Sequence, residues 1–75
     1  MFDATKIREH MEVVGSDGGH VGTVDHMDGE RIKLTKNDPS AAGEHHFVSP
    51  DHVASVDDKV RLSKSAAEAR SAIGL

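Results

Sequence analysis

Several short stretches of the chain alternate apolar and polar residues, which is the pattern of half-buried β-strands. The run 59–62, Lys-Val-Arg-Leu, shows it most plainly, because charged and apolar residues take turns along it. Similar stretches predict strands at 11–14, 20–27, 31–34 and 45–48. The pattern therefore predicts five strands, separated by turns that are rich in glycine and proline.

Glycines mark the first turn and the strand that follows it. The turn 15–19, Gly-Ser-Asp-Gly-Gly, allows the positive φ angles that tight turns need. Gly22 lies between valines three positions apart, where strict alternation fails, so we expect a β-bulge there. Bulges bend strands, and bent strands help a sheet close into a barrel. The residues to which we assign such backbone roles are Gly15, Gly18, Gly19, Gly22, Gly29 and Pro50.

The dipeptide Asp28-Gly29 predicts a hairpin between the second and third strands. A two-residue loop would set polar residues opposite Ile32 and Leu34. A three-residue loop that ends at Gly29 instead pairs Val24 with Ile32. The same loop places Gly22 opposite Leu34. We favour this loop because it lines the apolar side chains along one inward face.

The second half of the chain begins with a polar run at 36–44, which predicts the longest exposed loop. After the next strand, Ser49 caps a single helical turn that Pro50 begins. Val53 and Val56 lie on one side of this turn. The predicted core consists of Val14, Val21, Val24, Ile32, Leu34, Val48, Val53, Val56, Val60 and Leu62.

Helical signals occupy both ends of the chain. Residues 1–10 predict one helical turn, with Asp3 or Thr5 as its cap. In the tail, Ser65 and Glu68 fit a capping box. That helix has an apolar face of little but alanine, so it docks weakly, packs against another chain or frays, and we favour fraying or weak docking. The expected division is an N-terminal segment at 1–10, a β domain at 11–62 and a helical tail at 63–75.

Composition allows one small core and little more. Of the 75 residues, 36% are hydrophobic and 29% are charged, with two Phe and neither Trp nor Tyr. The chain has no Cys, which excludes a disulfide framework, a thiolate zinc site and a cysteine nucleophile. No apolar run is long enough for a transmembrane helix or a secretory signal, so we expect no membrane insertion and a cytoplasmic location.

The charge balance argues against nucleic acid as a partner. Nine basic and thirteen acidic residues give a net charge of −4, which repels phosphate backbones and anionic lipid. Basic residues recur at 31–36 and 59–64, but acids nearby offset them, and no Tyr or Trp can stack on bases. We therefore do not expect nucleic-acid binding.

Histidine is the one residue type in clear excess, with six copies. His20 and His26 would lie roughly 20 Å apart along one strand, too far to bind one ion. His45 and His46 are adjacent, so they point to opposite faces of a strand. The candidates for a metal site across strands are His26, His45 and His46, with a carboxylate such as Asp25. We favour solvated surface histidines over this metal site and over a pH response.

The candidate residues for an enzyme stand too close together. Ser49, Asp51 and His52 lie within one four-residue turn, where the three roles of a triad would face different directions. A barrel this small also has hardly any interior for a substrate. The acids around Gly29 lack calcium-loop spacing, and the glycine turn lacks the lysine and helix of a phosphate site. We therefore expect no enzyme and no cofactor.

Two stretches of the sequence carry a family resemblance. They are 13–24, Val-Val-Gly-Ser-Asp-Gly-Gly-His-Val-Gly-Thr-Val, and 47–60, which begins Phe-Val-Ser-Pro-Asp-His-Val. They resemble a family of short uncharacterised bacterial proteins related to the PRC-barrel domain, a small β-barrel. The resemblance covers roughly residues 7 to 65 and implies no catalytic residues. It implies a protein-docking module, since better-studied relatives use the barrel that way. Where such sequences often place a large aromatic residue, this chain has His52.

The predicted fold is therefore all-β: a small PRC-barrel-like antiparallel barrel of about five strands with a peripheral C-terminal helix. The predicted function is that of a non-enzymatic interaction (adaptor) module whose protein partner the sequence does not identify. A self-associating homodimer is the alternative, because self-association would stabilise a small core. A further alternative is a protein that binds a metal ion or responds to pH through its histidines. The residues predicted to make interactions are Phe47, His52 and Ile73.

Overall fold

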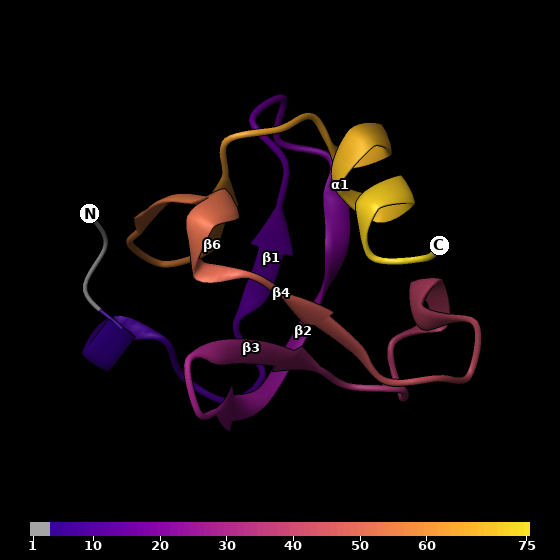
Figure 1. Cartoon of the computed structure of the whole chain (residues 1–75), viewed down its shortest axis with the longest axis horizontal. Coiled ribbons are helices and arrows are strands. Elements are labelled where there is room, and N and C mark those ends of the chain that lie inside the picture. The colour runs from indigo at the N-terminus through magenta and orange to yellow at the C-terminus, as the bar shows by residue number, and fades with distance from the viewer. Residues whose placement is uncertain (1–3) are drawn as a thin grey trace.

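A twisted six-stranded sheet forms the centre of the protein, whose computed structural model describes residues 4–75 (Figure 1). Its strands are β1 (Glu12–Val14), β2 (His20–Asp28), β3 (Arg31–Leu34), β4 (His46–Val48), β5 (Val53–Val56) and β6 (Val60–Leu62). Three short 3-10 turns, η1 (Ala4–Lys6), η2 (Pro39–Ala41) and η3 (Pro50–His52), and one α-helix, α1 (Ala66–Ala72), complete the described chain. The fold is thus mostly β with one C-terminal helix, as predicted.

The strands follow the order β4-β3-β2-β1-β6-β5 across the sheet. Neighbouring strands are antiparallel except β1 and β6, which run parallel with Val13 opposite Val60. The predicted all-antiparallel arrangement is wrong at this pair. After β4 the chain crosses to the opposite edge of the sheet, forms β5 there, and returns as β6, which lies beside β1. The described strands β4 and β5 do not pair with each other, so the sheet is not closed and the expected barrel is not confirmed.

The strand β5 was absent from the predicted five. Its two valines lie three positions apart, which suggested one side of a helical turn begun at Pro50. That turn is confirmed but ends after three residues, and its cap is the predicted one: the Ser49 hydroxyl accepts a hydrogen bond from the Asp51 N–H at 3.3 Å. From Val53 the backbone is extended, which suits β-branched residues. Val53 and Val56 are half-buried at the sheet edge rather than in the core.

The hairpin between β2 and β3 exists, but neither register considered from the sequence is the one observed. Its loop is Gly29-Glu30, with Asp28 opposite Arg31 and Met27 opposite Ile32. Gly29 has φ of 61°, a left-handed conformation that glycine adopts without strain. The turn is therefore one residue later than the Asp28-Gly29 signal suggested.

A bulge in β2 keeps the apolar side chains of this hairpin on one buried face, although the register differs from the predicted one. The pairing shifts between Val24 and His26, so that Asp25 is an extra residue on β2. Val24 consequently lies opposite Leu34. Both side chains, and that of Ile32, are buried as predicted, although the pairing that buries them is different.

A second bulge lies next to Gly22, where one was expected. Gly22 faces Val13 and His20 faces Val14, so Val21 is the extra residue. Gly22 has no positive φ. It is needed because a Cβ there would come within 2.9 Å of the Leu34 side chain, which packs against it.

The buried core agrees with eight of the ten residues predicted, since only Val53 and Val56 fall outside it. Val13, which the prediction missed, belongs to the main cluster, whereas its neighbour Val14 is buried apart from that cluster. This is the alternation expected of adjacent residues in a strand. The members of the cluster are Val13, Val21, Val24, Ile32, Leu34, Val48, Val60, Leu62 and Ala69.

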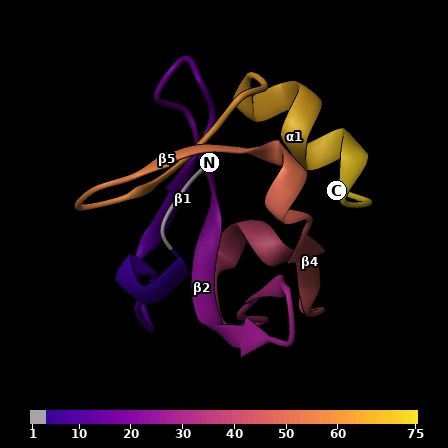
Figure 2. The same ribbon diagram turned by 60° about the vertical axis from the view of Figure 1, so that its left-hand side comes forward.

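The C-terminal helix docks on the sheet rather than fraying. Its predicted capping box is confirmed, because the Ser65 hydroxyl accepts the Glu68 N–H at 3.3 Å and donates to the Glu68 carboxylate at 3.1 Å. Ala69 is buried in the core against β2, where a larger side chain would not fit as closely. The alanine face, predicted to give only weak docking, therefore permits close packing. Figures 1 and 2 show α1 beside the end of the sheet that carries the glycine-rich turn.

That close packing explains the glycines of the first turn. Gly18 alone among the glycines of 15–19 has a positive φ, of 83°. Gly15 and Gly19 instead leave room for the start of α1: a Cβ on Gly15 would overlap the backbone N of Ala66, and a Cβ on Gly19 would come within 2.7 Å of the Ala66 Cβ. The prediction of a positive φ in this turn is thus correct for one glycine. The close approach of the helix explains why the other two positions are glycine.

Candidate functional site

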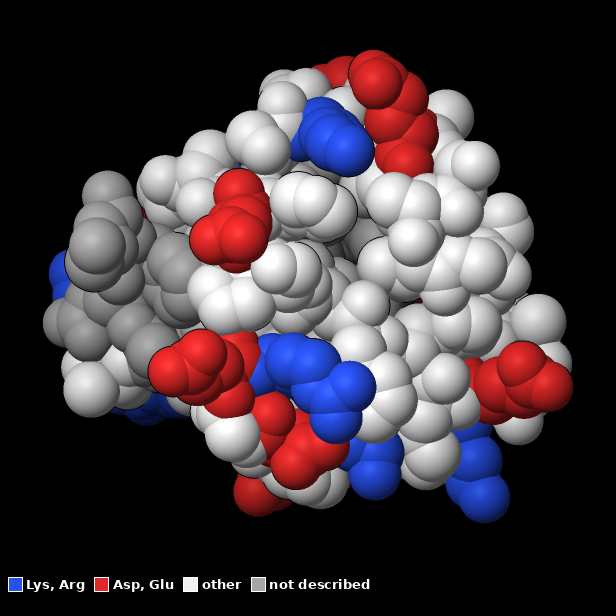
Figure 3. Space-filling model, in the orientation of Figure 1, with Lys and Arg blue, Asp and Glu red and all other residues white. Residues whose placement is uncertain are grey.

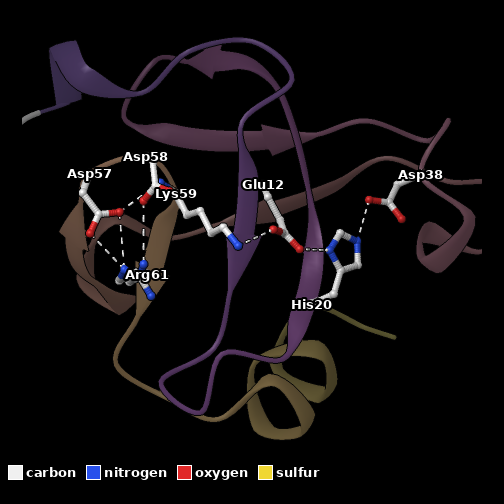
Figure 4. A network of polar contacts seen from close by, with 7 residues as sticks. All are labelled: Glu12, His20, Asp38, Asp57, Asp58, Lys59 and Arg61. Carbon is white, nitrogen blue, oxygen red and sulfur yellow. Dashed lines mark hydrogen bonds and ion pairs between the residues drawn. The ribbon is translucent and has the colours of Figure 1, made fainter.

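A row of four charged side chains links four segments of the chain (Figure 4). At its centre is His20, the first residue of β2. Its Nδ1 lies 2.8 Å from a carboxylate oxygen of Glu12 on β1, and its Nε2 lies 2.8 Å from one of Asp38, just before η2. Lys59, which precedes β6, completes the row with its ammonium 3.0 Å from Glu12. The row joins β1, β2 and the start of β6 to the loop between β3 and β4.

Asp38 is the buried member of this row, with a side chain only 5% exposed. The Thr23 hydroxyl donates a hydrogen bond of 2.6 Å to the same carboxylate oxygen that faces His20. A buried carboxylate is costly unless it is paired and hydrogen-bonded, and His20 and Thr23 meet that need. The bulge at Val21 matters here, because it sets the spacing of His20 and Thr23 along β2.

The electrostatics of the row favour a charged imidazole. Partial burial lowers the pKa of His20, but its hydrogen bonds to Glu12 and Asp38 outweigh burial and raise the pKa above its usual value. The same contact with His20, followed by that with Lys59, lowers the pKa of Glu12. Only an imidazolium carries an N–H on both ring nitrogens, so only this form donates to both carboxylates. Such a ring is a bridge between two elements and has no lone pair with which to act as a base.

A second ion-pair group closes the turn between β5 and β6. The Arg61 Nε lies 3.0 Å from an Asp57 carboxylate oxygen, and its Nη2 lies 3.7 Å from Asp58. The Lys59 backbone N–H donates to Asp57 at 3.0 Å, and together with Arg61 it lowers the pKa of Asp57 to about 2. These side chains are exposed, so their role is to fix the turn rather than to stabilise the fold strongly.

The histidines proposed as metal ligands do not form a site. Among residues 4–75, no group of three or more His, Cys, Asp or Glu side chains is placed to hold a metal ion. His26 and His45 lie 3.6 and 3.8 Å from the Asp25 carboxylate, as ion pairs if protonated. His46 points the other way, as its adjacency to His45 predicted, and is buried. Its Nδ1 lies 3.1 Å from the Ile73 carbonyl and its Nε2 2.9 Å from the Ala41 carbonyl.

The residues predicted to make interactions are half-buried and lie apart from the His20 row. The Phe47 ring lies under the Arg31 guanidinium, whose carbon is 4.2 Å from the ring centroid. His52 is tied through its backbone, since its carbonyl accepts the Ser63 N–H at 2.8 Å. Ile73 packs against the core at the end of α1. Their exposed fractions leave room for a partner but identify none.

A groove of about 550 Å³ lies between the N-terminal segment and the turn that joins β5 to β6. Its lining includes Lys6, Arg8, Met11, Val56, Asp57 and Asp58. Met11 and Val56 are its half-buried apolar residues. Elsewhere, acidic and basic side chains are interspersed over the face drawn in Figure 3, with no large area of one sign.

Sequence reasoning missed both the His20 row and the groove. Glu12, His20 and Asp38 are far apart in sequence, and their meeting depends on a bulge and on a loop folded against β2. The one available signal was His20 itself, a polar residue directly after a turn that brings β1 and β2 together.

Comparison with known proteins identifies a family and no close relative of known structure. No helix among the described residues is long and apolar enough to cross a membrane. No curated protein and no solved structure matches the chain. The expected kinship with PRC-barrel domains finds no support in these comparisons. Residues 7–70 match the family described as an uncharacterized protein conserved in bacteria (DUF2171), and the chain belongs to this family.

Proposed function

We propose that this chain is a non-enzymatic protein-interaction module that binds an extended segment of a partner protein at the β5 edge of its sheet. The observation that carries the proposal is the groove beside this edge. Among the described strands, β5 pairs only with β6, so its outer side offers unpaired backbone groups. Ala54 and Ser55 on β5 are exposed. An added strand from a partner satisfies such an edge, while side chains of the partner fill an adjacent groove.

The charges in the groove specify the partner segment. Asp57 and Asp58 are engaged by Arg61. Neither Lys6 nor Arg8 forms an ion pair within residues 4–75, so both cations remain available. The matching segment places an acidic residue against these two cations and an apolar residue against Met11 and Val56.

A displayed library of random peptides tests the proposal directly. We expect selection to enrich segments that combine an acidic and an apolar residue. The double variant Lys6→Glu/Arg8→Glu should bind these peptides at least about tenfold more weakly, because close like charges oppose association. The matched control, Lys33→Glu/Lys36→Glu, changes the charge equally on β3 and the following loop. The proposal is wrong if no peptide is enriched, or if the control variant loses as much affinity as the groove variant.

Self-association through β4 is the second candidate, because β4 is the other open edge and carries the half-buried Phe47. Two copies that paired their β4 strands would extend the sheet and cover the Phe47 ring. Sedimentation of the Phe47→Ser variant tests this: a dimer lost while the circular dichroism stays folded supports the interface. A wild-type monomer at high concentration removes this candidate.

A further inference from the structure

The loop between β3 and β4, residues 35–45, has two buried anchors, and each is held by a histidine. Asp38 and Ala41 are both buried. The Asp38 carboxylate lies 2.8 Å from Nε2 of His20, and the Ala41 carbonyl lies 2.9 Å from Nε2 of His46. Asp38 directly precedes η2 and Ala41 is its last residue, so the two imidazoles hold both ends of this short turn.

Both imidazoles have a hydrogen-bond acceptor at each ring nitrogen. For His20 the acceptors are the Glu12 and Asp38 carboxylates. For His46 they are the Ala41 carbonyl and the Ile73 carbonyl at the end of α1. A neutral imidazole has one N–H and one lone pair, so it satisfies one acceptor and turns the lone pair toward the other. Only the imidazolium donates to both.

We propose that the loop 35–45 is a proton-operated flap, held most firmly while His20 carries a proton on both nitrogens and loosened at its Asp38 anchor as the pH rises. This regulation goes beyond the proposed partner binding, since the flap and the β5 groove lie on different elements.

The charged groups around the two rings set the direction of the response. Glu12 and Asp38 face His20 directly, with Lys59 behind Glu12. Among residues 4–75, no ion pair involves His46; its neighbours are the two carbonyls and, across the strand pair, Leu34. Because the pKa of His20 is raised, the stability that its contacts give to the loop is complete below the usual histidine pKa. This stability is lost as the pH rises through the raised pKa.

The acid side of the response comes from Glu12. Because the pKa of Glu12 is lowered, the stability that its carboxylate contributes is present above the usual glutamate pKa. This stability is lost as the pH falls through the lowered pKa. The His20 contacts are therefore complete from weakly acidic pH to the raised pKa of His20. Asp38 keeps its hydrogen bond from Thr23 when His20 is neutral, so release weakens the loop without unfolding the sheet.

Amide hydrogen exchange measured against pH, corrected for the intrinsic pH dependence of exchange, tests the flap. The reporters are the amides of Ala41 and Glu44, which donate to the Asp38 and Ala41 carbonyls within the loop. We expect their protection to fall about tenfold between about pH 6 and pH 8.5, while the amide of Val24, on β2, stays protected. Equal protection of the loop at both pH values would overturn the proposal.

The variant His20→Gln isolates the role of the proton. Glutamine keeps a donor and an acceptor but cannot become cationic, so the loop should be poorly protected already at about pH 6 and change less with pH. His26→Gln is the matched control, because His26 lies on the same strand and forms its ion pair with Asp25 rather than with Glu12 or Asp38. The proposal fails if His20→Gln behaves like the wild type, or if His26→Gln abolishes the response.

The protonation of His20 can also be read directly in the wild type. Nitrogen NMR of the imidazole distinguishes a ring with two N–H groups from a ring with one. We expect His20 to carry two at about pH 6. One N–H on His20 at that pH would refute the fastening.

Discussion

Replacement of Gly15 by Ala is the sharpest test of how the C-terminal helix packs. Gly15 is buried directly after β1, and a Cβ on it would lie 2.7 Å from the Cα of Ala66 and from the carbonyl carbon of Ser65. These are backbone atoms, so no side chain can turn aside to make room. The substitution must push the start of α1 away from the first turn.

The cost follows from the contacts that must move. Forcing a methyl group into filled space costs about 1–3 kcal/mol. The shift also strains the hydrogen bond of 2.8 Å from the Ser16 N–H to the Lys64 carbonyl, and such a bond contributes about 1 kcal/mol. We therefore expect the free energy of unfolding to fall by about 2–4 kcal/mol, a large part of what a domain of this size possesses.

Urea unfolding followed by circular dichroism measures this loss. Ser16→Ala is the control, because Ser16 is exposed in the same turn and its replacement should change stability by no more than about 0.5 kcal/mol. Gly18→Ala separates the two glycine roles: it has open space but a φ of 83°, so it should cost only about 1–2 kcal/mol. A Gly15→Ala variant with the same midpoint of urea unfolding as the wild type would refute the close approach of α1.

Two further predictions concern the helix cap and the β5–β6 turn. Ser65→Ala removes the acceptor of the Glu68 N–H and should destabilise the protein by about 1 kcal/mol in thermal unfolding, whereas Ser71→Ala, at an exposed position of the same helix, should have little effect. Carboxyl NMR should find a pKa of about 2 for Asp57. The stability that its carboxylate contributes is therefore lost only as the pH falls from the usual aspartate pKa toward that value. Arg61→Gln should raise this pKa only in part, because the Lys59 backbone N–H still donates to Asp57; an unchanged titration would contradict the assigned contact.

Local signals predicted the elements that depend on neighbours in sequence. The strand that ends at Leu62 follows from strict alternation, and the caps at Ser49 and Ser65 follow from hydroxyls placed before short helical turns. Each of these depends on interactions within a few residues. Sequence patterns therefore predicted most of the strands, the helix and most of the core.

Features that depend on distant pairing were not predictable in the same way. A bulge at Asp25 lets β2 keep its buried face in a register that alternation alone would reject. Val53 and Val56 have helical spacing, yet the edge of β6 draws them into a strand. The contacts of His20 need two residues brought from other elements. In each case the deciding partner lies far along the chain.

The parallel pairing of β1 with β6 makes the middle of the sheet depend on both ends of the described chain. During synthesis, β1 can pair with β2 early, but its other side stays an open edge until Val60 has left the ribosome. Pairing of such distant segments requires closing a long loop, which slows folding. We therefore expect nascent chains of this protein to remain without a complete sheet until β6 has emerged, and to expose in that interval a valine-rich strand to other chains.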